Sequence, residues 1–205
     1  MLYSSRFVIL AGWLERQFPV TLDRDLPVFV NQDMCGFELY GTVDAAVCCF
    51  DSLNYILDEE KIDKCFGLVR NYLNPGGLFI FDVNSEYKFE SIYSNNDIIL
   101  ENKGVFCSWQ NSYNRKSRIC DFYITLFAEQ SDGSYKRYGE TQREKYYSID
   151  FFRNILEKNK FEDINIYCDF SVNKIYRDNG NNKDKESKKN KENKTERICF
   201  SAVNS

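Results

Sequence analysis

The sequence contains no histidine among its 205 residues. This absence excludes Ser-His-Asp and Cys-His catalysis, and every metal site that needs an imidazole ligand. The eight cysteines do not form a metal-site pattern either, because no Cys-x-x-Cys pair occurs and Cys48 and Cys49 are adjacent within an apolar run. We therefore expect no structural zinc site, and reduced, mostly buried thiols of the kind found in cytoplasmic proteins.

Long hydrophobic runs and an excess of basic charge are also missing. No apolar stretch reaches the length of a transmembrane helix. The formal net charge of −4 argues against general nucleic-acid binding, which usually requires a basic face. The apolar run at 7–14 lacks the basic start and the small-residue cleavage site of a signal peptide. We expect a globular, cytoplasmic protein with no membrane or nucleic-acid partner.

The stretch around which the rest is organised runs from Leu73 to Val83 and has the sequence LNPGGLFIFDV. Its Asn-Pro-Gly-Gly part predicts a turn, because proline cannot continue a helix and glycine accepts positive φ. The Leu-Phe-Ile-Phe run that follows predicts a strand buried on both faces of a parallel sheet. Asp82 stands at the carboxyl end of this strand, where open α/β sheets bind ligands.

The segments before this strand continue an α/β pattern. Apolar residues at helical spacing predict one helix over about 2–17 and a second up to Tyr72, with Asp58 as its N-cap. Short apolar runs predict strands over 27–31 and 43–50. Strands that alternate with helices indicate an α/β domain with a parallel sheet.

The pattern after residue 96 has a period of two and predicts an antiparallel meander inserted into the α/β frame. Asn-Lys-Gly, Asn-Arg-Lys-Ser and Ser-Asp-Gly turns separate its segments. We expect the meander strands at 98–101, 105–113, 118–129 and 135–147. We assign residues 1–96 and 148–205 to the α/β core, and residues 97–147 to the insertion.

The last part of the chain returns to the α/β frame. Ser148 is expected to cap a helix, and strands at 164–170 and 198–203 are expected to close the sheet as an antiparallel pair at its edge. Residues 177–197 are rich in Asn, Lys and Glu and have almost no apolar side chains. This composition predicts a disordered, solvated loop rather than a nucleic-acid-binding segment.

The order of these elements resembles the class I S-adenosylmethionine-dependent methyltransferases. The motifs that carry the resemblance are Gln-Asp-Met at 32–34, Asp-Ser-Leu-Asn-Tyr at 51–55 and the Pro-Gly-Gly strand. Over about residues 27–205 the chain is similar to small bacterial members with an antiparallel substrate-side insertion after the fifth strand. The resemblance implies a Rossmann-like, doubly wound sheet, S-adenosylmethionine as cofactor and methyl transfer to an unidentified, small-molecule acceptor.

The resemblance assigns cofactor-binding roles to four residues. Asp33 matches the acid that accepts hydrogen bonds from the adenine amino group, and Met34 matches the neighbour that packs on the ring. Phe50 and Asp51 match the stretch that passes the methionine end of the cofactor. Two plainer readings stay open, namely Asp33 as an ordinary turn residue and Asp51 as an N-cap.

On the substrate side, the resemblance places Asn84 and Tyr87 after the fifth strand, with Trp109 and Tyr113 of the insertion as walls. Ordinary packing is the alternative reading for each aromatic residue. Where the reaction needs a base, Asp51, Tyr87 or another carboxylate or phenol would serve, since histidine is absent. The acidic balance and the aromatic insertion lead us to expect an uncharged or weakly polar acceptor.

The chain departs from the family pattern at its start. The glycine-rich loop after the first strand and the acid at the end of the second are absent, since nothing before residue 27 offers Gly-x-Gly. We expect that the chain begins inside the domain and is N-terminally truncated relative to complete members. Such a chain would expose the apolar edge at 43–49 and would bind the cofactor weakly on its own.

Two other functions stay open. The missing glycine-rich loop favours a non-catalytic remnant that acts as a binding or pairing module. A nicotinamide-dependent enzyme on a similar sheet is the third reading, but it also requires a glycine-rich first turn and fits the antiparallel insertion less well. Binding of S-adenosylmethionine separates the enzyme from the remnant.

Overall fold

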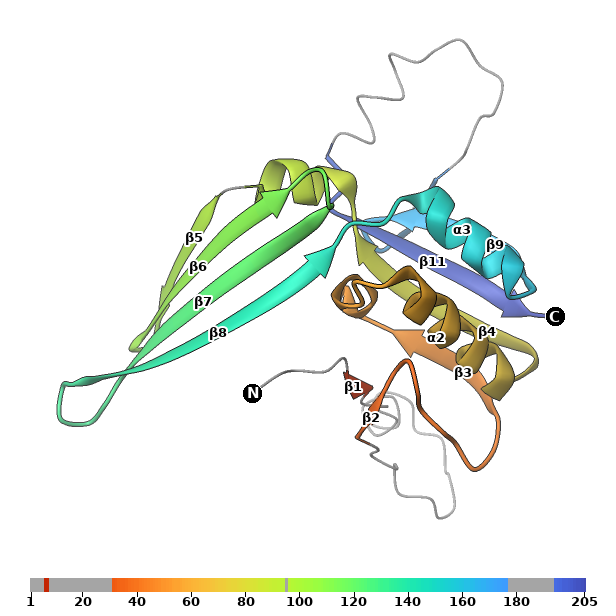
Figure 1. Ribbon diagram of the computed structural model, residues 1–205, viewed down its shortest axis with the longest axis horizontal. Helices are drawn as coiled ribbons and strands as arrows, with labels where there is room; N and C mark the ends of the chain where they lie inside the picture. Colours follow the sequence, from red (N-terminus) through yellow and green to blue (C-terminus); the bar gives the residue numbers. More distant parts are fainter. Residues whose placement is uncertain (1–5, 8–30, 95, 177–193) are drawn as a thin grey trace, which may run out of the picture.

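A computed structural model describes residues 6–7, 31–94, 96–176 and 194–205, and its described strands form three sheets (Figure 1). The strands are β1 (Arg6–Phe7), β2 (Gln32–Asp33), β3 (Val43–Cys48), β4 (Leu73–Asn84), β5 (Asp97–Asn102), β6 (Val105–Asn114), β7 (Ile119–Glu129), β8 (Tyr135–Lys145), β9 (Phe161–Cys168), β10 (Ser171–Ile175) and β11 (Arg197–Asn204). The helical elements are the 3-10 turn η1 (Ser52–Tyr55), α2 (Glu59–Tyr72), the π-helix η2 (Lys88–Tyr93) and α3 (Ile149–Lys158).

The largest sheet has the strand order β10-β9-β11-β4-β3. β3 runs parallel to β4, whereas β11 lies antiparallel between β4 and β9. The predicted antiparallel pairing of the two closing strands is therefore confirmed. Their predicted place at the edge is wrong, because β11 is an interior strand and β10, which the sequence pattern did not predict, forms the edge beyond β9.

Both described α-helices begin at the predicted caps. The Asp58 carboxylate accepts the backbone N–H of Glu60 at 2.9 Å, and Ser148 Oγ accepts the backbone N–H of Phe151 at 3.2 Å. These bonds satisfy N–H groups that have no partner inside the helix. The predicted helix boundaries are thus confirmed, because capping is a local property of the sequence.

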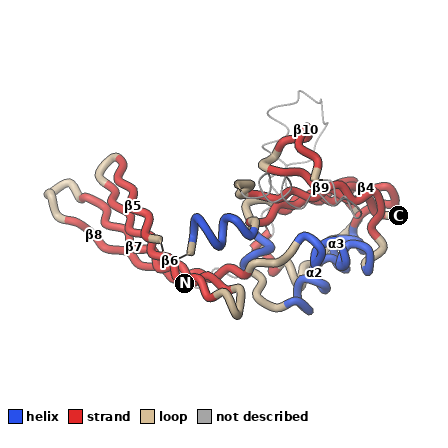
Figure 2. Tube along the Cα trace, turned by 90° about the horizontal axis from the view of Figure 1, so that it is seen from above, coloured by secondary structure: helices blue, strands red, loops and turns tan. Residues whose placement is uncertain are grey.

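α2 and α3 lie on one face of the large sheet (Figure 2), and aromatic side chains join them to it. Phe66 of α2 contacts Phe79 and Phe81 of β4 edge-on, with 5.3 Å between ring centroids in both pairs. Phe152 of α3 stacks on Phe66 at 6.2 Å and also contacts Phe81 at 5.4 Å. All four rings are at most 1% exposed, so they form the centre of the core.

The prediction that β4 is buried on both faces is wrong. Phe79 and Phe81 face the helices, but the alternate residues Leu78 and Ile80 are each 36% exposed. The reason is that both described α-helices cover the same face. β3 is the edge strand of this sheet within the described residues, and Val47 on it is 47% exposed.

The Asn-Pro-Gly-Gly segment lies within β4 as a bulge rather than as a separate turn before it. Leu73 of β4 pairs with Val43 of β3, and Leu78 pairs with Ala45. The four residues of β4 between these pairs therefore lie opposite the single residue Asp44. Gly76 has φ +78°, which only glycine adopts without strain. The glycines predicted to allow a turn thus allow the chain to pass directly from α2 into the sheet.

Strands β5, β6, β7 and β8 form a separate antiparallel sheet in that order, which confirms the predicted meander. It extends from the large sheet as an arm (Figure 1). Its base packs on η2 through a second, smaller core of Phe89, Tyr93, Cys120 and Phe122. The division into core and insertion at residues 97–147 stays an interpretation of this arrangement.

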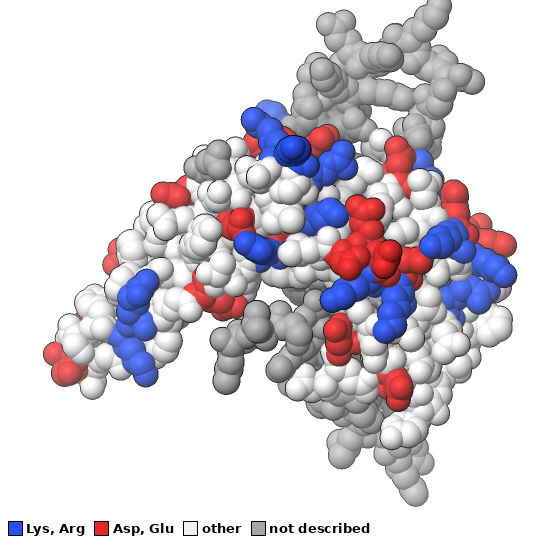
Figure 3. Space-filling model, in the orientation of Figure 1, with Lys and Arg blue, Asp and Glu red and all other residues white. Residues whose placement is uncertain are grey.

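Acidic side chains gather over the region where α2 and α3 begin (Figure 3). Glu59 and Glu60 lie in the first turn of α2 and Asp150 in the first turn of α3. Negative charge there is favourable because the N-terminal end of a helix carries a partial positive charge. No described helix combines the length and the apolar composition that crossing a membrane requires.

The N-terminal predictions fall mostly on residues outside those described. Within the predicted helix at 2–17, Arg6 and Phe7 instead form β1 and pair antiparallel with β2. The helix is therefore wrong at these two positions, and its remainder is outside the described residues. Residues 27–30 of the predicted strand at 27–31 are likewise outside the described residues. β2 follows this segment and, in the described part of the chain, pairs only with β1.

The predicted disordered loop at 177–197 extends too far at its carboxyl end. Residues 177–193 are outside the described residues. Thr195 is buried, and Arg197 begins β11 and forms ion pairs with the buried Asp82 and the partly buried Asp51. The prediction is wrong for these residues because composition does not distinguish one partly buried, paired arginine from the solvated charges beside it.

Replacing Gly77 by alanine should destabilise the fold by about 1–3 kcal/mol. A Cβ at this position would lie 2.8 Å from the Asn74 carbonyl oxygen and 3.2 Å from that of Asp44, and backbone cannot move aside easily. Urea unfolding followed by circular dichroism measures the change. Gly41→Ala is the matched control, since its Cβ would meet nothing within 4 Å. Equal effects of the two substitutions would contradict the close approach.

Candidate functional site

The carboxylate at the end of β4 organises the turn that follows β3. Asp82 accepts the backbone N–H of Phe50 at 2.8 Å with one oxygen and that of Asp51 at 3.0 Å with the other. Arg197, at the start of β11, donates a hydrogen bond to the second oxygen. Asp82 is 2% exposed, and these three donors compensate the burial of its charge.

The turn held by Asp82 has an unusual backbone. Phe50 has φ 58° and Asp51 has φ 52°, so two successive residues with side chains lie in the left-handed region. Each such residue costs about 1–3 kcal/mol and requires support from its surroundings. The two hydrogen bonds to Asp82 provide that support. The turn leaves the Phe50 side chain 79% exposed and brings Asp51 into contact with Asn84.

Asn84 connects this turn to the meander. Its Nδ2 donates to Asp51 Oδ2 at 2.6 Å and to Glu144 Oε2, at the end of β8, at 2.8 Å. Its backbone N–H donates to Asn54 Oδ1 at 2.9 Å. Arg197 completes the network with an ion pair to Asp51 Oδ1 at 3.2 Å. Asn84, Asp82 and Glu144 are buried, whereas Asp51 and Arg197 are partly exposed. The network therefore forms one continuous polar layer that reaches the surface at this edge of the sheet.

Glu144 is a buried acid in this layer and is only 1% exposed. Burial raises its pKa to about 8, and the negative charge of Asp51 contributes in the same direction. Hydrogen bonds from Asn84 and Tyr55 lower the pKa and offset only part of this effect. Glu144 is therefore largely protonated at neutral pH and carries charge only under mildly alkaline conditions.

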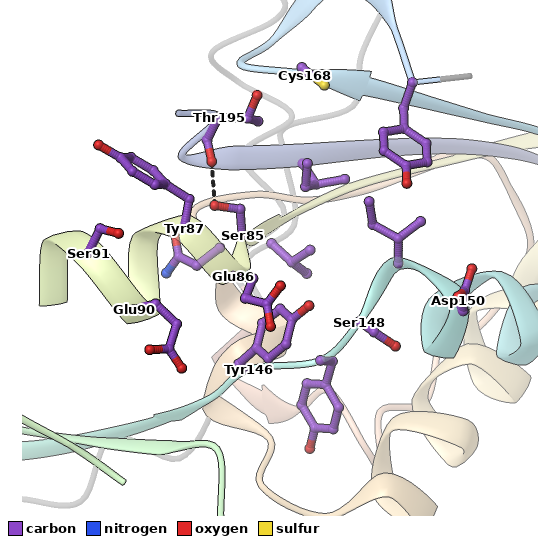
Figure 4. A pocket seen from close by; sticks show the side chains of 16 residues that line it. Ser85, Glu86, Tyr87, Glu90, Ser91, Tyr146, Ser148, Asp150, Cys168 and Thr195 are labelled. Carbon is purple, nitrogen blue, oxygen red and sulfur yellow. Dashed lines mark hydrogen bonds between the residues drawn. The ribbon is translucent and has the colours of Figure 1, made fainter. Parts of the chain in front are cut away.

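A cavity of about 520 Å³ adjoins the polar layer (Figure 4). It lies between the beginning of η2, the link from β8 to α3, and the adjacent ends of β9 and β11. The hydrogen bond from Ser85 Oγ to the Thr195 carbonyl oxygen joins two sides of its lining. Its lining residues are Val83, Asn84, Ser85, Glu86, Tyr87, Glu90, Ser91, Tyr146, Tyr147, Ser148, Ile149, Asp150, Cys168, Tyr176, Thr195 and Ile198.

The cavity brings together two of the four predicted substrate-side residues, Asn84 and Tyr87. The other two, Trp109 and Tyr113, do not line it. Trp109 packs against Phe122, with 5.7 Å between ring centroids, and Tyr113 packs against Phe89 at 5.5 Å. Trp109 and Tyr113 thus pack against the second core. Their role as walls of a substrate site stays a prediction.

Of the predicted adenine-binding residues, Asp33 ends β2 and Met34 begins the tight turn that follows. Asp33 is exposed, and its Oδ1 accepts the backbone N–H of Cys35 at 2.8 Å, which is the ordinary turn geometry considered above. Met34 is only 2% exposed and packs in the main core rather than on the surface. Contact of either residue with adenine stays a prediction, and the exposed Asp33 is the better placed of the two.

The sequence did not single out Glu144 and Arg197 as members of the polar layer, and it suggested a different role for Asp82. Asp82 was expected to face a ligand, but its oxygens are engaged by Phe50, Asp51 and Arg197. Glu144 lies in a stretch of mainly polar residues that is typical of a solvated strand, so no local signal marked it as buried. Arg197 borders a charged loop in the sequence. A search for charges flanking apolar strands would have found Arg197 but not Glu144.

No known family profile matches the chain. Two curated bacterial proteins are similar to it: "Putative methyltransferase GWCH70_2453" of Geobacillus sp. (strain WCH70), 28% identical over 143 residues, and "Putative methyltransferase YqeM" of Bacillus subtilis (strain 168), 26% identical over 147 residues. Each alignment covers 70% of this chain and 58% of the other protein. The chain thus matches a little over half the length of these relatives.

Among solved structures, an S-adenosylmethionine-dependent methyltransferase from Clostridium acetobutylicum ATCC 824 superposes with a TM-score of 0.72 and 27% identity, covering 94% of this chain and 69% of that one. The chain has the class I methyltransferase fold. The CcbJ methyltransferase from Streptomyces caelestis shares it with a TM-score of 0.65 at 12% identity, covering 85% of this chain and 66% of that one. The Rossmann-like architecture predicted from the sequence is confirmed.

Asp82→Asn should destabilise this methyltransferase fold by about 2–4 kcal/mol. The amide has one acceptor oxygen instead of two and no charge, so Arg197 loses an ionic partner and one N–H of the strained turn loses its acceptor. Urea unfolding at pH 7 measures the effect. Asp121→Asn is the control, because its ion pair with Arg143 is exposed and should contribute about 1 kcal/mol or less. A loss no larger than that of the control would refute the role assigned to Asp82.

Glu144→Gln should remove a component of the pH dependence of stability. Because the folded state raises the pKa of Glu144 from 4.5 to about 8, it favours the protonated acid. The free energy of unfolding of the unmodified protein should therefore fall, relative to that of the variant, as pH rises from about 5 to about 8, by about 2–4 kcal/mol. Urea unfolding at several pH values measures this difference. Glu101→Gln, exposed on β5, should leave the pH dependence unchanged; parallel curves for all three proteins would count against the buried acid.

Proposed function

We propose that this protein transfers a methyl group from S-adenosylmethionine to a small-molecule acceptor. The class I methyltransferase fold and the two related curated proteins support this activity. One observation carries the proposal further. Asn84 belongs both to the polar layer that holds the Phe50–Asp51 turn and to the lining of the cavity. The predicted methionine end of the cofactor and a space for the acceptor therefore share one side chain.

The residues at this edge offer suitable partners for the cofactor. Phe50 presents an exposed ring, which is an apolar surface beside Asp51. Asp33 presents an exposed carboxylate that is able to accept a hydrogen bond from an adenine amino group. When bound, S-adenosylmethionine supplies an already activated methyl group on a positively charged sulfur. The protein then contributes mainly position, charge and exclusion of water.

The charge of the polar layer suits a sulfonium. Asp51 and Asp82 carry two negative charges against the single positive charge of Arg197, and Glu144 is largely neutral. Both oxygens of Asp51 are engaged, one by Arg197 and one by Asn84. A carboxylate held in this way acts as a fixed negative charge rather than as a proton acceptor. Of the two predicted bases, Tyr87 at the cavity is thus the better placed.

The ribose end of the cofactor has no counterpart in the sequence motifs. No Gly-x-Gly and no second-strand acid precede residue 27, and these groups hold the sugar in the family. The rival function is a non-catalytic module that keeps the fold. Affinity for the cofactor distinguishes the two, because an enzyme requires binding near physiological concentrations of its substrate.

Calorimetric titration with S-adenosylmethionine tests the proposal. Methyl transfer by this chain requires a dissociation constant in the micromolar range, and binding should be roughly tenfold weaker in Asp33→Ala, the loss of about one hydrogen bond. Asp44→Ala is the control, since Asp44 lies near the amino end of β3, where its side chain accepts a hydrogen bond from Asn74 at 2.7 Å. Binding that is absent or millimolar would overturn methyl transfer by this chain and support the non-catalytic module.

A further inference from the structure

The cavity beside Asn84 has a strongly one-sided charge. Three carboxylates, Glu86, Glu90 and Asp150, line it, and its lining residues include no lysine or arginine. Glu90 is already paired with Arg115 at 2.5 Å, and Asp150 with Arg153 at 3.3 Å. Of the three carboxylates, Glu86 is thus the one whose charge is not paired within the described residues.

Glu86 forms no ion pair with another described residue. In Figure 4 its carboxylate lies beside the ring of Tyr146. Burial raises the pKa of Tyr113 to about 12, and the charges of Glu90 and Glu86 contribute in the same direction. Burial also raises the pKa of Tyr146, and the charge of Glu86 adds to this effect. The guanidinium of Arg118 lies 5.8 Å from the Tyr146 ring, and its charge partly offsets this effect. The cavity thus keeps a net negative potential on the side of Glu86.

An unused hydrogen-bond acceptor lies in the same lining. Asn84 is 0% exposed and donates to Asp51 and Glu144 through Nδ2, but its Oδ1 has no hydrogen-bond partner among the described residues. A buried acceptor without a donor costs about 1–3 kcal/mol. Since Asn84 lines the cavity, a ligand with N–H groups would satisfy Oδ1 from there.

We propose that the acceptor is an amine, bound in this cavity as an ammonium ion with Glu86 as its counter-ion and Asn84 Oδ1 as a hydrogen-bond acceptor. The inference rests on the proposed methyltransferase function and names its substrate class. It differs from the expectation of an uncharged or weakly polar acceptor, which came from the overall charge and from the aromatic residues of the insertion. Tyrosine rings in the lining, such as those of Tyr87 and Tyr146, provide faces that attract a cation.

The reaction balances without a further reagent. The ammonium ion first gives one proton to a carboxylate of the cavity, which frees the lone pair on nitrogen. The nitrogen then forms a bond to the methyl carbon of S-adenosylmethionine while the carbon–sulfur bond breaks and its electron pair stays on sulfur. The positive charge passes from sulfur to the methylated nitrogen, so the product leaves as an ammonium ion.

Binding of three probe molecules of similar shape tests the substrate class. Phenethylamine is cationic, 2-phenylethanol is neutral and 3-phenylpropanoate is anionic, and each is titrated into the full chain by NMR. We expect the amine to bind at least tenfold more tightly than the alcohol, and the acid not to bind. In Glu86→Gln the affinity for the amine should fall about twofold to fivefold, as expected for an ion pair with an exposed carboxylate. In Glu157→Gln, exposed on α3 and outside the cavity lining, it should stay unchanged.

The outcomes separate this inference from the proposed function. Equal affinity for amine and alcohol, or an amine affinity that does not depend on Glu86, overturns the amine acceptor even if S-adenosylmethionine binds. Preference for the amine that depends on Glu86 supports the cavity assignment even if the calorimetric titration with S-adenosylmethionine fails. Circular dichroism spectra of both variants that match the unmodified protein show that the substitutions leave the fold intact.

Discussion

The fold around the candidate site depends on a single buried carboxylate. Asp82 holds the backbone of two left-handed residues that follow one strand and the guanidinium at the start of another, so it ties three elements at one edge of the sheet. Without a negative charge there, the strained turn would relax and Arg197 would be buried with one partner fewer. The positions of Phe50 and Asp51 are therefore consequences of an interaction that does not itself touch a ligand.

The elements of the chain could largely be predicted, because they depend on local chemistry. The caps at Asp58 and Ser148, the meander strands and the parallel pair flanking α2 follow from short sequence patterns. The faces of the strands were harder. The run from Leu78 to Phe81 is apolar throughout, and only the placement of both helices on one side decides which residues stay exposed. Residue composition alone carries no information about that placement.

The site was less predictable than the fold, since its members come from distant segments. The resemblance pointed to Asn84 and Tyr87, and the structure places both at one cavity. It also pointed to Trp109 and Tyr113, whose aromatic rings fill the small core instead. Glu144 and Glu86 carried no signal, because an acid on an alternating strand or after a strand is usually solvated. Their environment is created by tertiary contacts with η2 and the β8–α3 link.

The position of β11 bears on how the molecule reaches this structure. β11 is the partner of both β4 and β9, and the contact between Arg197 and Asp82 joins residues 115 positions apart. The sheet therefore closes around a strand that is distant in sequence from one of its two neighbours. Such long-range pairing slows folding, because the entropy of a large loop is lost before the contact forms. While β11 is not docked, β4 has an open edge, and an open edge is where self-association competes with assembly.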